Sequence, residues 1–272
     1  MSARSIRRSR IVGSTVAAIV ALTAALGGAA PAGAVQPAPV AKYVALGDSY
    51  AAGQGAAAPL DSCLRSNAAY PVLLDAEPRT NLLRFPACSG DGIAEVAATQ
   101  LSQVNRGTTL VTLTVGANDL GAGAAYAACV PDPTSFACAA ALATVQQVLQ
   151  SGAIATGVGG LVAAIAERAP NAHIVVTDYP IPFKPALQPP ITDAVNAAIV
   201  QLDTQIAQAV AAAAAAGADV ELASVALAFV GHQIGDPTPW LGADSTNPIT
   251  FLHPTADGQA VYRAAVLTAL AS

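Results

Sequence analysis

Charged and aromatic side chains are scarce in this sequence: Asp, Glu, Lys and Arg make up 11% of the residues, and Phe, Trp and Tyr 4%. After residue 34 there is no run of Lys or Arg, and acidic residues outnumber basic ones. This balance argues against nucleic acid and against an anionic membrane surface as partners, since both attract positive charge. The few aromatic rings leave no evident stacking platform for bases or sugars.

Several common motifs are missing as well. The sequence has neither a P-loop nor the GxGxxG dinucleotide fingerprint, so no phosphate-binding turn is evident. It also lacks GxSxG, the turn that holds the nucleophile in α/β-hydrolases. A reactive group, if the chain has one, must therefore lie in a different kind of turn.

Cysteine is limited to Cys63, Cys88, Cys129 and Cys138. They form no CxxC pair and lie far in sequence from the three histidines, so a zinc site is disfavoured and we expect no metal. In an exported chain, an even number of cysteines indicates two disulfides. Three connectivities are possible, and we favour Cys63–Cys88 and Cys129–Cys138 because closure between nearest neighbours is the simplest.

The N-terminus has the pattern of a secretory signal. Four arginines precede residue 11, Ile11–Ala30 is apolar, and Ala32-Gly33-Ala34 offers the small residues of a cleavage site. We therefore expect residues 1–34 to be a signal peptide and the protein to be secreted or associated with the cell wall. An uncleaved membrane anchor is the alternative, since the apolar run is long enough to span a bilayer. Arg7-Arg8 leaves the choice between the general and the twin-arginine export route open.

Cleavage after Ala34 would leave 238 residues, a length that suits one domain with a full core. The four arginines leave with the signal, so eight basic residues face 17 acidic ones and the net charge is −9. We expect a flexible leader at 35–41, a single domain at 42–272, no membrane span after cleavage, and a monomer.

Short apolar runs alternate with helical stretches through this domain. The composition predicts strands at Tyr43–Leu46, Leu82–Ala87, Thr109–Val115, His173–Thr177 and Val220–Val225. It predicts helices at Gly92–Val104, within Ala139–Arg168, and at Thr192–Ala216 and Thr255–Leu270. Such alternation is typical of parallel β-α-β units, so the expected fold class is α/β with helices on both faces of the sheet.

Polar residues stand where these strands end. Asp48 and Ser49 follow the first strand, Gly90 lies after the second, Asn118 follows the third, and His253 precedes the last helix. In an open parallel sheet, sites form beyond the carboxyl ends of the strands. Serine, histidine and a set of N–H donors are the groups that acyl transfer requires.

Each of these residues has a definite expected role. The Ser49 hydroxyl would be the nucleophile and the His253 imidazole its base. The N–H groups of Ser49 and Gly90 and the amide of Asn118 would stabilise the oxyanion of a tetrahedral intermediate. Asp48 is expected to brace the turn rather than to take part in the chemistry.

The stretches ALGDSYAAGQG, ACSGDG, TVGANDLG and FLHPTADGQ resemble the four sequence blocks of the GDSL, or SGNH, hydrolase family, in the family's order. Ser49, Gly90, Asn118 and His253 match the four residues of that name, and the blocks extend over most of the chain. The strongest likeness is to secreted actinobacterial esterases and lipases. The resemblance implies a three-layer α/β/α sandwich with a central parallel sheet of about five strands, and ester hydrolysis without a cofactor.

Two departures from the family pattern stand out. The family usually has an aspartate three residues before the histidine, but Thr250 holds that place here. We expect a Ser49–His253 dyad oriented by the Thr250 main-chain carbonyl, with Asp244 as the reserve candidate. Secreted relatives often carry a third disulfide between two loops that correspond to 178–190 and 231–240, which lack cysteine here. We expect these two loops to form the walls of an acyl pocket.

The sequence thus predicts a serine esterase or lipase that acts on carboxylic esters, with a small-molecule or lipid ester as its substrate. A carbohydrate O-deacetylase or an acyltransferase would use the same residues. A catalytically silent binding module is the alternative that is not an enzyme, and the presence of all four matched residues speaks against it.

Overall fold

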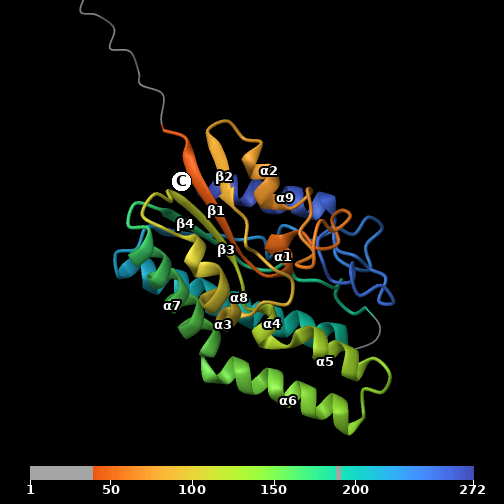
Figure 1. Ribbon diagram of the computed structural model, residues 1–272. Coiled ribbons are helices and arrows are strands. Elements are labelled where there is room, and N and C mark those ends of the chain that lie inside the picture. The colour runs from red at the N-terminus through yellow and green to blue at the C-terminus, as the bar shows by residue number, and fades with distance from the viewer. Residues whose placement is uncertain (1–38, 188–190) are drawn as a thin grey trace, which may run out of the picture. The chain divides into compact units, whose positions relative to one another are not determined.

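The computed structural model describes residues 39–187 and 191–272. The predicted signal peptide at 1–34 and the first part of the predicted leader lie outside the described residues. A five-stranded parallel sheet runs through the described part of the chain (Figure 1), in the order β2-β1-β3-β4-β5. Its strands are β1 (Ala41–Gly47), β2 (Thr80–Arg84), β3 (Leu110–Thr114), β4 (His173–Thr177) and β5 (Val220–Ala223).

The strand order places a topological switch point between β1 and β3. The chain leaves β1 toward one edge of the sheet, and after β3 it builds toward the other edge. Loops diverge at such a point, and in open parallel sheets ligands bind beyond the strand ends there. Ser49 follows β1 and Asn118 follows β3, so two of the predicted site residues flank this point.

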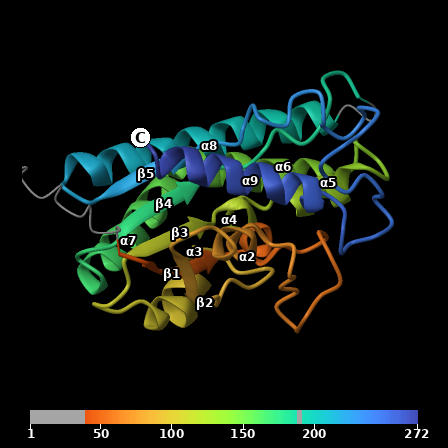
Figure 2. The same cartoon turned by 90° about the horizontal axis from the view of Figure 1, so that it is seen from above.

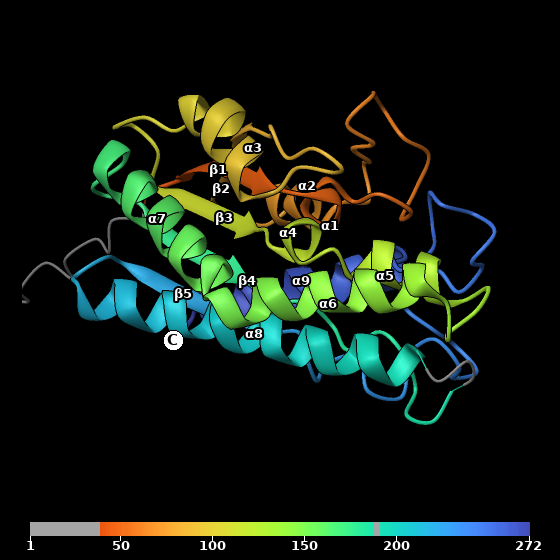
Figure 3. The same cartoon turned by 90° about the horizontal axis from the view of Figure 1, so that it is seen from below.

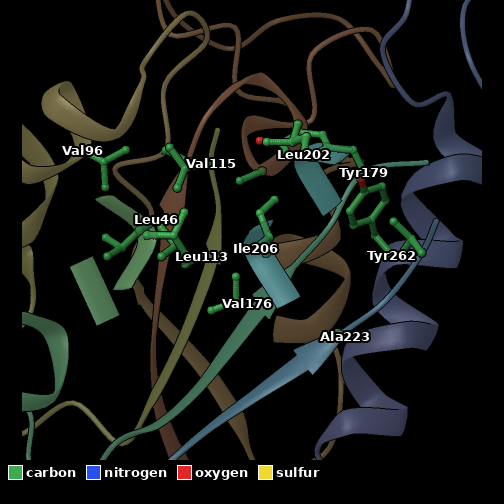
Figure 4. Packing of buried hydrophobic residues seen from close by; sticks show 14 of the residues in the cluster. Leu46, Val96, Leu113, Val115, Val176, Tyr179, Leu202, Ile206, Ala223 and Tyr262 are labelled. Carbon is green, nitrogen blue, oxygen red and sulfur yellow. The ribbon is translucent and has the colours of Figure 1, made fainter. Parts of the chain in front are cut away.

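The central strands are apolar because both of their faces are covered. Every residue of β3 is buried, as are the last five residues of β1, which explains their near-continuous hydrophobic runs. Figure 4 shows Leu46, Leu113 and Val176 gathered in the core near Ile206 of α8. Full burial of one such side chain contributes about 1.5–3 kcal/mol to the free energy of unfolding.

Helices cover both faces, which confirms the predicted α/β/α sandwich. On one side α2 (Tyr70–Asp75) packs with α9 (Ala256–Ala269). On the other, α3 (Ile93–Glu95) and α7 (Ala153–Arg168) pack with each other, and α7 runs beside α8 (Ile191–Ala215), as Figures 1 and 3 show. A π-helical turn, Val96–Gln100, and a 3-10 turn, Leu101–Gln103, continue α3.

Five of the described helices were not expected from the sequence, or not as they stand. They are α2 and also α1 (Ser49–Ala52), α4 (Ala117–Leu120), α5 (Ala122–Cys129) and α6 (Phe136–Ser151). The single helix expected within Ala139–Arg168 is two helices, α6 and α7, because Gly152 between them adopts a left-handed conformation with φ of 68°. The helices α5 and α6 pack on α8 and extend the molecule at one end (Figures 2 and 3).

The second strand begins and ends earlier than the sequence predicts. It stops at Arg84, and residues 85–88 leave the sheet. There the N–H of Cys88 donates to the Gly47 carbonyl, at 3.0 Å, and Cys88 forms a disulfide with Cys63. The apolar Phe85 and Ala87 therefore belong to the loop that leads to Gly90.

Among the described residues, no single helix has both the length and the apolar composition needed to cross a bilayer. Only α6 and α7 together reach them, and they are bent by 53° at their junction.

Candidate active site

The turn after β1 puts Ser49 at the start of a helix. Gly47 has a φ of 139°, and a Cβ there would lie 2.3 Å from the Thr114 carbonyl oxygen, so only glycine fits. Asp48 caps α1 by accepting the N–H of Tyr50 at 2.9 Å. Ser49 is the first residue of α1 and is 6% exposed. The Asp-Ser pair therefore forms a helix cap and also presents a hydroxyl at the strand end.

His253 reaches this hydroxyl from the far end of the sequence. Its Nε2 lies 2.9 Å from the Ser49 Oγ, although the two residues are 204 positions apart in the sequence. Tyr50 helps to hold the segment that carries His253, because its hydroxyl donates to the Leu252 carbonyl at 2.5 Å. The structure thus brings together the predicted nucleophile and the predicted base.

Burial lowers the pKa of His253 from 6.5 to about 4, because desolvation penalises the charged imidazolium. A hydrogen bond with the Phe251 backbone acts in the opposite direction and is the smaller effect. At neutral pH the ring is therefore neutral, which is the state in which Nε2 can accept a proton from a hydroxyl.

The groups expected to orient His253 lie elsewhere. The Thr250 carbonyl accepts the main-chain N–H of His253, at 3.0 Å, and not the ring. The Asp244 carboxylate accepts the N–H and hydroxyl of Thr246, at 2.9 and 2.7 Å, and faces solvent. The backbone group that hydrogen-bonds the ring is that of Phe251, two residues before the histidine rather than three.

Two of the predicted oxyanion donors, Ser49 and Asn118, follow the neighbouring strands β1 and β3, and the third, Gly90, lies in the loop between β2 and α3. Gly90 has a φ of 87°, is exposed, and has no atom within 4 Å of where a Cβ would stand, so a ligand can approach its backbone. The Asn118 Nδ2 donates to the Asp91 carbonyl at 2.8 Å, which uses one of its two hydrogens. Among residues 39–187 and 191–272, neither the second hydrogen nor the N–H of Ser49 at the start of α1 has a hydrogen-bond partner, so a ligand can accept from both.

Close packing fixes the loop that carries Gly90. Both carboxylate oxygens of Asp119 accept the N–H of Ile93, at 3.1 and 3.0 Å. A Cβ on Gly92 would lie 2.9 Å from that carboxylate, so a larger residue there would have to displace the Asp119 side chain. From the π-helical turn, the Gln100 Nε2 donates to the Gly47 carbonyl and to the Asp91 carboxylate, at 2.9 and 2.7 Å. Turns of this type are frequent at functional sites.

Asp48 belongs to a buried polar network behind the site. The hydroxyl of Tyr179 donates to the Asp48 Oδ2 at 2.5 Å, and the N–H of Tyr179 donates to the Asp203 Oδ1 at 3.0 Å. Burial raises the pKa of Asp48 to about 7, although the hydrogen bond from Tyr179 opposes this shift. Asp48 thus stabilises the turn, as expected from the sequence. Among the described residues, the Ser49 hydroxyl hydrogen-bonds His253 and not Asp48.

A pocket of about 510 Å³ opens beside Ser49 and His253. Its walls are mostly apolar and come from α5 and the residues after it, from α8, from the segment after β4 and from the histidine segment. The lining includes Ala122, Gly123, Tyr126, Ala127, Val130, Pro131, Pro180, Pro182, Val195, Ile199, Pro248, Phe251 and Leu252. The expectation for its walls is thus half correct: 178–190 contributes, whereas α5 and α8 take the place expected for 231–240.

Two disulfides hold the outer parts of the site. Cys63–Cys88 joins the loop before α2 to the loop that carries Gly90, and Cys129–Cys138 joins the end of α5 to the start of α6. The first therefore anchors the loop that carries Gly90, and the second anchors α5, which lines the pocket.

Sequence reasoning missed three site residues: Gln54, Gln100 and Tyr179. Tyr179 could have been found, because it follows β4 just as Ser49 follows β1. Gln54 and Gln100 act through long side chains that reach across loops, and nothing in the local sequence indicates the direction in which they point.

Comparison with known proteins finds one family and several similar sequences. The profile of the GDSL-like Lipase/Acylhydrolase family matches residues 45–261. The chain is 37% identical to "Lipase 1" of Streptomyces coelicolor and 34% identical to "Lipase" of Streptomyces rimosus, in each case over 93% of this chain and 95% of the relative.

Solved structures show the same fold. The extracellular lipase of Streptomyces rimosus superposes with a TM-score of 0.75, at 32% identity, over 84% of this chain and 99% of that one. Phospholipase A1 of Streptomyces albidoflavus NA297 superposes with a TM-score of 0.76, at 29% identity, over 85% of this chain and 99% of that one.

Proposed function

The chain belongs to the GDSL-like lipase/acylhydrolase family and is a carboxylic ester hydrolase; from this we propose that it cleaves acyl esters of lipids through an acyl-enzyme on Ser49, with His253 as the base. The observation that carries the proposal is the 2.9 Å contact between the Ser49 Oγ and the His253 Nε2 at the mouth of an apolar pocket. A hydroxyl is a weak nucleophile until such a base accepts its proton.

The steps follow from this contact. The Ser49 Oγ attacks the ester carbonyl carbon while the His253 Nε2 takes its proton. The tetrahedral intermediate bears a negative oxygen, which the N–H groups of Ser49 and Gly90 and the Asn118 amide stabilise. The C–O bond to the alcohol then breaks, and the imidazolium returns the proton to the leaving alkoxide. A water molecule, deprotonated by the same imidazole, then attacks the acyl-enzyme carbonyl carbon. The bond from that carbon to the Ser49 Oγ breaks, the imidazolium returns the proton to the Oγ, and the carboxylic acid is released.

The imidazolium formed in these steps is stabilised by a main-chain group rather than by a carboxylate. The hydrogen bond with the Phe251 backbone favours a proton on Nδ1, and this leaves the lone pair of Nε2 toward Ser49. A buried carboxylate would hold the charge more strongly, so we expect this dyad to depend heavily on its oxyanion donors.

The pocket supports an acyl chain as the bound group. Its walls carry aliphatic side chains, prolines and the rings of Tyr126 and Phe251. No Asp, Glu, Lys or Arg lines it, so His253 in its protonated form is the one lining residue that carries a charge. A volume of about 510 Å³ lies within the ordinary range of ligand pockets. Similar proteins carry the names lipase and phospholipase A1, which agrees with a lipid ester.

We infer that the protein acts outside the cell. The signal pattern at 1–34 and the two disulfides support export, since disulfides persist in oxidising compartments. The similar lipase of Streptomyces rimosus is described as extracellular.

The decisive experiment labels the purified protein with a fluorophosphonate and locates the adduct by mass spectrometry. We expect the adduct on Ser49, and no adduct and no ester hydrolysis in Ser49→Ala. A series of p-nitrophenyl esters of increasing chain length, beside acetylated xylan, identifies the substrate class. A preference for medium or long acyl chains supports the proposal, and release of acetate from xylan alone would replace it with a carbohydrate deacetylase. Activity that survives Ser49→Ala would end it.

A further inference from the structure

Gln54 is the side chain that links the separate loops of the site. It follows α1 and its C-cap Gly53, it is 5% exposed, and its main-chain N–H donates to the Ser49 carbonyl at 3.0 Å. Its backbone is therefore part of the turn that carries the nucleophile. Its side chain leaves this turn and reaches two others.

The amide of Gln54 makes hydrogen bonds to both of these loops. Its Nε2 lies 3.0 Å from the Ile249 carbonyl oxygen and 3.3 Å from that of Pro248, on the segment that leads to His253. Its Oε1 accepts the hydroxyl of Ser89, the residue before Gly90. These partners fix the orientation of the amide, because carbonyl oxygens can only accept and must face its nitrogen.

Two glycines place Gln54 where it can do this. Gly53 has a φ of 76°, and a Cβ there would lie 2.5 Å from the Ala69 Cβ. Gly55 has a φ of 82°, and a Cβ there would lie 3.2 Å from the His253 Cβ and from the Thr250 Cα. The chain therefore passes closely against Ala69 just before Gln54 and against the histidine segment just after it, which explains the Gly-Gln-Gly stretch in the first sequence block.

The amide also faces the imidazole. The Gln54 Nε2 lies 3.3 Å from the His253 Nδ1. The two hydrogens of the Gln54 Nε2 are directed at the Ile249 and Pro248 carbonyls, so neither is directed at the ring. The ring hydrogen-bonds the Phe251 backbone instead. The imidazole therefore faces the positive end of the Gln54 amide dipole. This arrangement disfavours a second proton on the ring. In a Ser-His-Asp triad, a carboxylate would face the ring instead.

We propose that Gln54 is a positioning residue for ester hydrolysis, which sets the distance between the His253 segment and the Gly90 loop and keeps the imidazole neutral and turned toward Ser49. The proposal rests on the proposed roles of Ser49, Gly90 and His253. The other titratable groups near the ring are Tyr50, whose ring centroid lies 5.7 Å away, and Asp48, which caps the helix that carries Ser49. Asp244 lies on the same loop as His253, but its carboxylate is exposed and accepts the N–H of Thr246.

Gln233 provides a matched control. It is also 5% exposed, and its Nε2 also donates to two carbonyls, those of Ile181 and Phe183, each at 2.9 Å. It ties a loop in the same way, but it contacts neither His253 nor Ser89. A purely structural role for Gln54 would make the two glutamines equivalent.

The experiment compares Gln54→Met, Gln54→Glu, Ser89→Ala and Gln233→Met with the wild type on p-nitrophenyl butyrate between pH 4 and pH 8, with the product measured by chromatography. We expect Gln54→Met to lower kcat about 10- to 100-fold with little change in KM, because small misplacements of reacting groups have effects of this size. The acid limb of kcat/KM, which reports the pKa of the base in the free enzyme, should move to higher pH in Gln54→Met. It should move further in Gln54→Glu, where a carboxylate faces the ring.

The two other variants separate the parts of the proposal. Ser89→Ala removes only the tie to the Gly90 loop, so it should lower kcat several-fold and leave the acid limb in place. Gln233→Met should lower the urea midpoint of unfolding and leave both kcat and the acid limb unchanged. An unchanged kcat and acid limb in folded Gln54→Met would overturn the proposal; if that variant does not fold, an unchanged kcat in Ser89→Ala would do so. Failure of the proposed function is distinct, because the wild type would then carry no fluorophosphonate on Ser49.

Discussion

The hydroxyl of Tyr179 donates a hydrogen bond of 2.5 Å to the carboxylate of Asp48, and so joins the end of β4 to the residue before Ser49. The two residues are 131 positions apart in sequence, and both are buried. The turn that carries Ser49 is therefore held by the segment after β4, although β3 lies between β1 and β4 in the sheet.

Tyr179→Phe should destabilise the fold and slow the reaction. The substitution leaves the buried Asp48 oxygen without its donor, which costs about 1–3 kcal/mol in the free energy of unfolding. We also expect a lower kcat, because the Asp48 turn carries Ser49. Urea unfolding and steady-state kinetics measure the two effects. Tyr43→Phe is the control: it removes a buried hydroxyl that bonds Thr112 at 2.7 Å, so it should cost stability without changing kcat.

Asp203 should make the stability of the protein depend on pH. Burial is the largest cause that raises its pKa to about 8, followed by the charge of Asp178, and its Oδ2 has no hydrogen-bond partner among the described residues. A carboxyl group with a raised pKa in the folded state favours folding while it is protonated. This contribution is complete below the unfolded pKa of about 3.8 and is lost as the pH rises toward 8.

We therefore expect the urea midpoint of the wild type to fall between pH 5 and pH 9, and Asp203→Asn to fall less. The asparagine keeps an oxygen for the N–H of Tyr179 and cannot ionise. Parallel slopes for the two proteins would contradict the assignment of the pH dependence to Asp203, and the slope that remains in the variant would belong to groups such as Asp48.

Asn118→Ala should reduce turnover far more than substrate binding. Loss of one oxyanion donor lowers kcat about 100- to 1,000-fold in comparable sites, since the donor acts mainly on the transition state. Steady-state kinetics on a soluble ester should show this fall in kcat with little change in KM. Because the Asn118 amide also bonds the Asp91 carbonyl, circular dichroism should accompany the measurement to exclude a displaced loop. A kcat within threefold of the wild type would remove Asn118 from the oxyanion hole.

Gly123→Leu should shorten the acyl chain that the protein accepts. Gly123 lines the pocket from α5, and no atom lies within 4 Å of where its Cβ would stand, so a leucine can enter the pocket without a clash. We expect kcat/KM to be retained for p-nitrophenyl acetate and to fall at least about tenfold for the decanoate, a loss of about 1.4 kcal/mol in transition-state binding. An equal loss on both esters would place the acyl chain elsewhere. Gly159→Leu, on α7 away from the pocket and equally open, controls for a general effect of a glycine replaced in a helix.

The sequence predicts the layers of this fold well because its periodicity is strong there. All five expected strands are present, and His173–Thr177 has the predicted bounds, since buried parallel strands appear as unbroken β-branched runs. It fails where short helices depend on tertiary contacts. In α5, for example, nearly every residue is small and apolar, so no amphipathic face marks the helix, and its position depends on α6, α8 and a disulfide.

The site divides in the same way. Ser49, Gly90, Asn118 and His253 could be named because each stands next to a strand end or a helix start, and the order of the blocks is characteristic. The group that orients the histidine could not be found from the family's spacing of three residues before His253. A main-chain carbonyl can be supplied by any residue, and only the turn from Thr250 to His253 determines that Thr250 bonds backbone while Phe251 meets the ring.

The Cys63–Cys88 bond gives the protein a dependence on its surroundings. The N–H of Ser89 donates to the Cys63 carbonyl at 3.0 Å, so the cross-link and this bond together hold the stretch from which the Gly90 N–H projects. Reduction of the disulfide would remove the covalent part of this anchor, and the segment of Ser49 and that of His253 are not cross-linked by it. If hydrolysis needs the Gly90 N–H as proposed, it therefore also needs Cys63 and Cys88 in their oxidised form.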